Sequence, residues 1–154
     1  MSGPALPATL PAITLWQPWA TWVALGWKTI ETRTHPHLRR LAGFRVALHA
    51  GKRLHPEAFS IAKAYLGEER GREAWRWLQD GRYPLGAVVC TAQVVWHQRL
   101  TAGNSQAALC DCSGGDLFGL LLTGVRRVEP PVPWRGSRGI WYLPADALPA
   151  EAVR

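Results

Sequence analysis

Two neighbouring stretches decide the fold: Gln17-Pro18-Trp19-Ala20, and Gly26-Trp27-Lys28-Thr29-Ile30-Glu31-Thr32-Arg33. A short apolar run, residues 12–15, precedes them and predicts a strand. Pro18 suits the first position of a helix, and Trp19, Trp22, Val23 and Gly26 follow at the spacing of one helix face. Residues 28–33 are rich in β-branched side chains and predict a second strand, on which Glu31 and Arg33 share a face about 7 Å apart.

The remaining chain continues the alternation of strands and helices. We expect strands over residues 44–50, 87–96, 117–128 and 139–143, helices over 55–66 and 68–79, and a polar loop over 97–116. Regular crossover helices do not separate these strands, which predicts an α+β fold with a mixed, curled sheet. The predicted organisation is a loose segment 1–11, one domain over 12–143 and a tail over 144–154.

Composition excludes several classes of protein. The 154 residues are 47% apolar and 19% charged, which excludes disorder as the default state and fits a single domain. No apolar run approaches the roughly 18 residues of a membrane span, and the first ten residues lack the basic n-region of a signal peptide. We therefore expect a soluble, cytoplasmic protein. Phosphate-binding glycine loops and a G-x-S-x-G elbow are also missing from the sequence, which argues against kinases, dehydrogenases and the common hydrolase fold.

The charge balance indicates an anionic partner. Eighteen basic residues, fifteen of them arginine, face eleven acidic ones and give a net charge of +7. Arginine presents a planar donor fork that suits phosphate, and a basic domain is typical of nucleic-acid binders. The nine tryptophans supply rings that either pack the core or stack on bases.

The motifs resemble the ASCH family. Five segments match its pattern in order over residues 12–143: Gln17–Ala20, Gly26–Arg33, Phe44–Ala50, Pro84–Val89, and Pro133–Gly136 with Gly139–Trp141. The resemblance implies a small β-barrel with flanking helices, similar to the PUA domain. It also implies a cleft between the first helix and the barrel, lined by Lys28, Glu31 and Arg33.

The resemblance implies more than one activity. Members of the family bind RNA or DNA, cleave single-stranded RNA, or hydrolyse the acetyl amide of N4-acetylcytidine. The last branch uses a lysine and a threonine of the motif with a later glutamate. Lys28 matches the lysine, but Glu31 stands at the threonine position and the later glutamate has no match. The sequence also reads Ala42-Gly43 where the family has Arg-Gly, so Arg40 is the candidate for that basic contact.

Lys28 and Glu31 are the candidate catalytic residues. A buried carboxylate with a tuned pKa transfers protons, and a nearby cation stabilises a developing anion. The alternative is that Glu31 and Arg33 form a structural ion pair. The candidate nucleic-acid-binding residues are the following: Trp19, Lys28, Arg33, Arg40, Arg45, Lys52, Arg53, Arg135 and Arg138.

Three further alternatives stay open at the level of sequence. Trp19 either stacks on a base or packs against Trp22, and His49 is either a hydrogen-bonded sheet residue or a general base. The glycine beside Arg135 and Arg138 allows close approach of a phosphate, although solvated loop charges are the simpler interpretation.

Metal binding and cofactors are not expected. The cysteines Cys110 and Cys112 with His97 lack the C-x-x-C spacing of zinc sites. The predicted function is binding of nucleic acid, RNA in preference to DNA, or of a nucleotide. A hydrolase using Lys28 and Glu31 and a protein-interaction module with tryptophan anchors are the alternatives.

Overall fold

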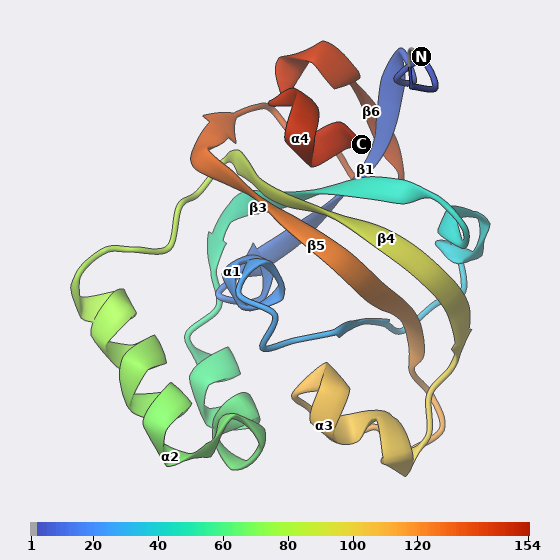
Figure 1. Ribbon diagram of the computed structural model, residues 1–154. Helices are drawn as coiled ribbons and strands as arrows, with labels where there is room; N and C mark the ends of the chain where they lie inside the picture. The colour runs from blue at the N-terminus through green and yellow to red at the C-terminus, as the bar shows by residue number, and fades with distance from the viewer. Residues whose placement is uncertain (1–2) are drawn as a thin grey trace.

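A six-stranded sheet with the order β2-β5-β4-β3-β1-β6 forms the centre of the molecule. The computed structural model describes residues 3–154 (Figure 1). The α-helices and strands are, in chain order, β1 Thr9–Gln17, α1 Trp19–Ala24, β2 Ile30–Arg33, β3 Arg45–Leu54, α2 Glu57–Gln79, β4 Ala87–Arg99, α3 Ser105–Ala108, β5 Phe118–Pro133, β6 Trp141–Pro144 and α4 Ala150–Val153. Three 3-10 turns cover residues 39–41, 102–104 and 145–147.

The sheet is mixed, which confirms the predicted α+β class. Strands β1 and β3 run parallel, and the other neighbouring pairs are antiparallel. The sheet curls strongly, but β2 and β6 stand at its two ends in the strand order. No strand ladder joins these two edges within residues 3–154, so the closed barrel implied by the family resemblance is not confirmed.

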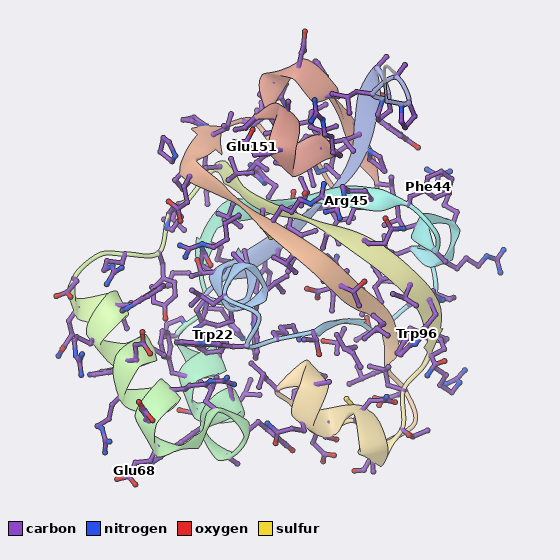
Figure 2. All side chains as sticks on the ribbon, viewed as in Figure 1. Trp22, Phe44, Arg45, Glu68, Trp96 and Glu151 are labelled. Atoms are coloured by element: carbon purple, nitrogen blue, oxygen red, sulfur yellow. The ribbon has the colours of Figure 1, made fainter. Side chains whose placement is uncertain are left out.

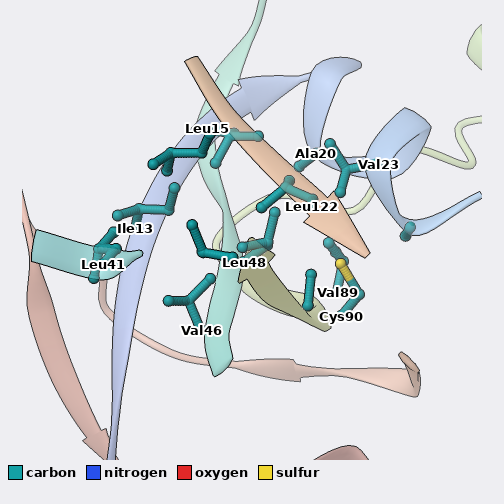
Figure 3. Close-up of a cluster of buried hydrophobic side chains, with 14 of the residues drawn as sticks. Ile13, Leu15, Ala20, Val23, Leu41, Val46, Leu48, Val89, Cys90 and Leu122 are labelled. Atoms are coloured by element: carbon teal, nitrogen blue, oxygen red, sulfur yellow. The ribbon is translucent and has the colours of Figure 1, made fainter. Parts of the chain in front are cut away.

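One core fills the concave side of the sheet, beneath α1. Alternate residues of the strands, including Ile13, Val46 and Leu48, point into it and form one cluster with Ala20 and Val23 of α1 (Figure 3). Helix α1 buries five of its six residues, which explains why its sequence is apolar on most sides. Burial of this kind contributes about 25 cal/mol for each Å² of apolar surface.

A second core lies on the other side of the same strands. Leu10, Ala12 and Ala47 occupy the alternate positions of β1 and β3, and the C-terminal segment covers them (Figure 1). Within that segment Ala152 and Val153 of α4 are buried. The residues predicted as a tail therefore pack on the sheet. At the other end of the chain, β1 begins at Thr9, three residues before its predicted start.

Two helical stretches of α2 form a hairpin that projects from the sheet (Figure 1). Gly67 separates them with φ 81° and ψ 171°, a conformation that side chains other than glycine adopt only with strain. The two predicted helices, 55–66 and 68–79, correspond to the two stretches. Trp22 of α1 is fully buried beneath the hairpin and donates a hydrogen bond to the Tyr83 hydroxyl at 3.2 Å (Figure 2).

The predicted loop over 97–116 contains more structure than expected. Strand β4 extends to Arg99, and the short helix α3 follows a 3-10 turn. Helix α3 packs near β2 and, as described below, buries a predicted site residue. Across residues 3–154, none of the helices combines the length and the apolar character needed to cross a membrane.

Candidate functional site

A cleft of about 990 Å³ lies where β1, β2, β3 and the segment before β6 meet. Four basic side chains line it, together with two tryptophans and two histidines: Arg33, Lys52, Arg135, Arg138, Trp16, Trp134, His35 and His49. Among the residues that the structure describes, no aspartate or glutamate lines this cleft. The cleft is therefore a concave surface of positive charge.

Strand alternation directs the β1 side chains into the cleft. Leu15 points into the first core, so its neighbours Thr14 and Trp16 face the opposite way. Trp16 is 45% exposed, and the Arg53 guanidinium lies 4.6 Å from its ring centroid. The ring of His55 meets Trp16 edge-on, with 5.3 Å between ring centroids. An exposed indole held between two neighbours is a ready surface for stacking.

Residues 134–139, here called the arginine turn, close one side of the cleft and carry Arg135 and Arg138. His49 on β3 contacts the backbone of this turn, because its Nε2 lies 2.7 Å from the carbonyl oxygen of Trp134. A carbonyl only accepts, so Nε2 carries the proton and Nδ1 is left as an acceptor, 3.1 Å from the Thr14 hydroxyl. That hydroxyl has one proton to donate, and its two acceptors are His49 Nδ1 and, at 3.3 Å, the carbonyl oxygen of Ser137. The Thr14 hydroxyl in turn accepts from Trp141 Nε1 at 3.2 Å.

The same histidine limits which residue fits in the turn. A Cβ at Gly136 would lie 2.5 Å from His49 Cε1 and 2.7 Å from Thr14 Oγ1. Glycine is therefore required at position 136 by the close approach of the turn to β3. Burial lowers the pKa of His49, and its hydrogen bond to the Trp134 carbonyl opposes this shift. Both ring nitrogens have partners within the protein, so His49 is a hydrogen-bonded sheet residue.

Arg33 connects the cleft to the strand motif. Its Nε lies 3.7 Å from Glu31 Oε1, and its guanidinium donates to the backbone carbonyl of Thr14 at 3.2 Å. Glu31 is buried, and its second oxygen, Oε2, has no hydrogen-bond partner within residues 3–154. The predicted shared face of Glu31 and Arg33 is confirmed, and only Arg33 lines the cleft.

Lys28 lies in the interior, away from the cleft. It is 2% exposed, its Nζ donates to the carbonyl of Ala108 at 2.6 Å, and the Trp19 ring centroid lies 4.9 Å from that nitrogen. Burial lowers the pKa of Lys28, while the charge of Glu31 acts in the opposite direction. The cleft implied by the resemblance, lined by Lys28 and Glu31, is thus replaced by one that these two residues do not line.

The other predicted residues fall in three places. Trp19 is half-buried, packs against Trp22 with ring centroids 5.2 Å apart, and does not line the cleft. Arg40 and Arg45 line a separate groove beside β6. Arg53 contacts the cleft only through the ring of Trp16. Of the nine candidate binding residues, four line the cleft directly: Arg33, Lys52, Arg135 and Arg138.

Sequence reasoning missed Trp16 and Thr14 as cleft residues, and predicted His35 only as a surface residue of the basic patch. The alternation of β1 carried the signal for the first two, because Thr14 and Trp16 flank the buried Leu15. His35 stacks on His37 with 4.4 Å between ring centroids, and its pKa is lowered by burial and by the neighbouring His37 and Arg33. Within residues 3–154 no three histidine, cysteine or acidic side chains gather as a metal site would require.

Comparison with known proteins identifies the fold. No protein-family model and no curated protein matches the sequence. Among solved structures, the crystal structure of ASCH from Zymomonas mobilis superposes with a TM-score of 0.56 at 13% identity, covering 89% of each chain. A serine-to-alanine variant of that protein superposes with a TM-score of 0.53 at 13% identity, covering 93% of this chain and 94% of the other. A tyrosine-to-phenylalanine variant superposes with a TM-score of 0.53 at 12% identity, covering 89% of this chain and 91% of the other. The chain therefore has the ASCH domain fold.

Proposed function

We propose that the cleft binds single-stranded RNA or a nucleotide. The observation that supports this most directly is the convergence of Arg33, Lys52, Arg135 and Arg138 on one concave surface without an acidic side chain among the described lining residues. Guanidinium groups match the geometry of phosphate oxygens. The net charge of +7 draws a polyanion toward the molecule as a whole.

Trp16 provides the contact that distinguishes a nucleotide from a simple anion. Its ring is exposed within a cleft of basic side chains, and base stacking on such a ring contributes about 1–3 kcal/mol. A base must be unpaired to reach a ring inside a cleft, which favours a single strand over a duplex. The cleft volume of about 990 Å³ is in the range of sites for small molecules.

Fluorescence anisotropy with a labelled single-stranded RNA tests the proposal. Each phosphate contact contributes about −0.7 to the slope of log affinity against log salt. If all four cleft cations contact phosphates, the slope is about −2.8, four times that value. We expect Arg135→Ala and Arg138→Ala each to reduce the slope by about 0.7. Arg76→Ala on α2, outside the cleft, is the matched control and is expected to leave the slope unchanged.

Two outcomes would contradict RNA binding in the cleft. The first is an affinity that does not depend on salt, as expected for a protein partner held by tryptophan anchors, or no binding at low salt. The second is an equal loss of affinity in the cleft variants and in Arg76→Ala, because that result would reflect net charge alone. A DNA strand of the same sequence, measured in parallel, tests the expected preference for RNA.

A hydrolase is the second candidate, and one observation favours it. Glu31 Oε2 is buried without a hydrogen-bond partner in the described part of the chain, and a catalytic role is one explanation for such a group in a native structure. Glu31 approaches the cleft through Arg33, whose Nε lies 3.7 Å away. The roles predicted for Lys28 as anion stabiliser and for Glu31 as proton-transfer group stay predictions.

Turnover assays separate the two functions. A binder shows no cleavage of single-stranded RNA and no deacetylation of N4-acetylcytidine. An enzyme shows one of these reactions, and Glu31→Gln abolishes it while the ligand still binds, because the amide keeps the shape and loses the proton-transfer group. Thermal melting must accompany the assay, since loss of the Glu31 charge leaves Arg33 uncompensated and costs up to about 3–5 kcal/mol if the pair is fully buried.

A further inference from the structure

We propose that the groove formed by Arg40, Phe44, Arg45 and Tyr142 is a second RNA subsite, which holds a nucleotide of the same strand that occupies the cleft. This inference rests on the proposed function and extends its footprint beyond the cleft. The groove has a volume of about 520 Å³.

Two aromatic rings in this groove are largely exposed to solvent. Phe44 is 58% exposed and Tyr142 is 57% exposed, and both line the hollow (Figure 2 labels Phe44 and Arg45). Strand alternation explains the position of Tyr142: its neighbours on β6, Trp141 and Leu143, are buried in the second core. Neither ring has a ring partner within residues 3–154. Exposed rings of this kind are stacking surfaces for unpaired bases.

The charge around the two rings is positive. Arg40 and Arg45 line the groove, and no acidic side chain lines it among the residues that the structure describes. Arg45 donates to the Thr91 hydroxyl at 3.0 Å, which fixes its guanidinium without neutralising it. The salt bridges within residues 3–154 involve neither arginine. This combination of exposed rings and uncompensated guanidinium groups complements a nucleotide, because the base stacks on a ring and the phosphate accepts hydrogen bonds from a guanidinium group.

The groove and the cleft draw residues from the same two chain segments, but from opposite faces of β1. On β1, Thr14 and Trp16 line the cleft and Thr9 and Pro11 line the groove. Tyr142, which pairs with Pro11 across β1 and β6, comes three residues after Gly139 of the cleft. Pro11 and Thr14 are about 10 Å apart along the strand, at roughly 3.3 Å per residue, and face opposite sides of it, so an RNA strand that occupies both hollows passes round the sheet edge at β6. A few nucleotides of an extended strand span that distance, well within the site sizes of single-strand binders.

The test compares a short ligand with a long one. Affinities for uridine monophosphate and for a labelled 12-nucleotide single-stranded RNA are measured with wild type, Phe44→Ala, Tyr142→Ala and Arg40→Ala. We expect each variant to bind the mononucleotide as the wild type does, because the cleft is intact. Loss of one ring should weaken binding of the long RNA about fivefold or more. Arg40→Ala should reduce the salt slope for the long RNA by about 0.7.

Matched controls and a direct mapping complete the experiment. Trp75→Ala removes an equally exposed ring from α2, and Arg76→Ala removes a charge there; neither should change the affinity for the long RNA. The same RNA carrying 4-thiouridine is photo-crosslinked, and the modified peptides are identified by mass spectrometry. Crosslinks at Phe44 or Tyr142, in addition to the cleft, are expected.

The outcomes distinguish this inference from the proposed function. If cleft variants weaken binding of the long RNA and the groove variants do not, and crosslinks occur only in the cleft, the groove inference is wrong and the proposed function stands. If Phe44→Ala or Tyr142→Ala changes the sedimentation of the free protein and not its RNA affinity, the occupant is a second copy of the chain, which overturns the inference. Failure of the wild type to bind either ligand refutes both.

Discussion

Replacing Gly136 with alanine is expected to push the arginine turn away from β3. The added Cβ would lie 2.5 Å from Cε1 and 2.6 Å from Nδ1 of His49, and 2.7 Å from Thr14 Oγ1. These distances are too short for carbon, so either the turn or the histidine ring must move. Movement of the turn breaks the 2.7 Å hydrogen bond between His49 Nε2 and the Trp134 carbonyl, which holds the turn over the cleft.

The magnitude follows from overpacking. Forcing an extra methyl group into a close-packed contact costs about 1–3 kcal/mol. For a chain of this length, each kcal/mol lowers the melting temperature by roughly 2–4 °C, so Gly136→Ala should melt about 2–12 °C below the wild type. The RNA salt slope should also fall by about 1.4, since the displaced turn carries two cations that contribute about 0.7 each. Thermal melting and anisotropy titrations measure the two effects.

A second substitution identifies the contact responsible. His49→Ala removes two of the three close neighbours of the new methyl group, so the double variant should lose less stability than the sum of the single variants, by about 1 kcal/mol or more. Gly139→Ala is the control: it has open space but φ +65°, so its strain of about 1–2 kcal/mol should be unaffected by His49→Ala. Additive losses for Gly136→Ala and His49→Ala, or a wild-type melting temperature for Gly136→Ala, would refute the proposed packing of the turn.

Three further predictions concern stability, stacking and metal. Burial lowers the pKa of Lys28, so the contribution of this group to stability rises as the pH approaches about 10.4, its ordinary pKa in the unfolded chain. Burial raises the pKa of Cys90 to about 12 and that of Cys112 to about 11, which acts in the opposite direction. The Lys28 contribution is therefore the difference between the melting curves of wild type and Lys28→Met, and the wild type should gain stability relative to the variant from about pH 7 to 10. Trp16→Ala should weaken RNA binding about 5- to 150-fold with little change in melting. Trp19→Ala, at a half-buried ring beside the buried Trp22, should instead lower stability, by less than the about 3–5 kcal/mol of a fully buried tryptophan. Elemental analysis should find no stoichiometric zinc, and about one zinc per chain that is lost in Cys110→Ser would contradict this.

Local patterns predicted most of the secondary structure. The break at Gly67 separated the two helices of α2 because a glycine between two apolar-periodic runs is a local signal. The start of β1 at Thr9 was missed because its pairing partner is Pro144, at the far end of the chain. The packing of Ala152 and Val153 in the second core was also missed, since a helix of four residues carries no readable period.

The site was predictable in part. Arg33 was indicated by its place in the motif, Arg135 and Arg138 by the glycine between them, and Lys52 by its charge; all four line the cleft. The position of Lys28 depends on α3, because the Lys28 ammonium donates a hydrogen bond to the carbonyl oxygen of Ala108 in that helix. Helix α3 lies in a segment that was predicted to be a loop. Contacts made by elements distant in sequence decide whether a charged side chain reaches the surface, so the motif could not show that Lys28 is buried.

The pairing of β1 with β6 has a consequence for the order of folding. Thr9 pairs with Pro144, and Trp141 donates to Thr14 across the same junction. During synthesis these contacts cannot form until nearly the whole described chain has left the ribosome, and pairings between residues so distant in sequence form slowly. The arginine turn, tethered between β5 and β6, is therefore among the last parts to become ordered. A nascent or truncated chain without β6 can hold much of the first core and still lack a formed cleft, so ligand binding reports that folding is complete.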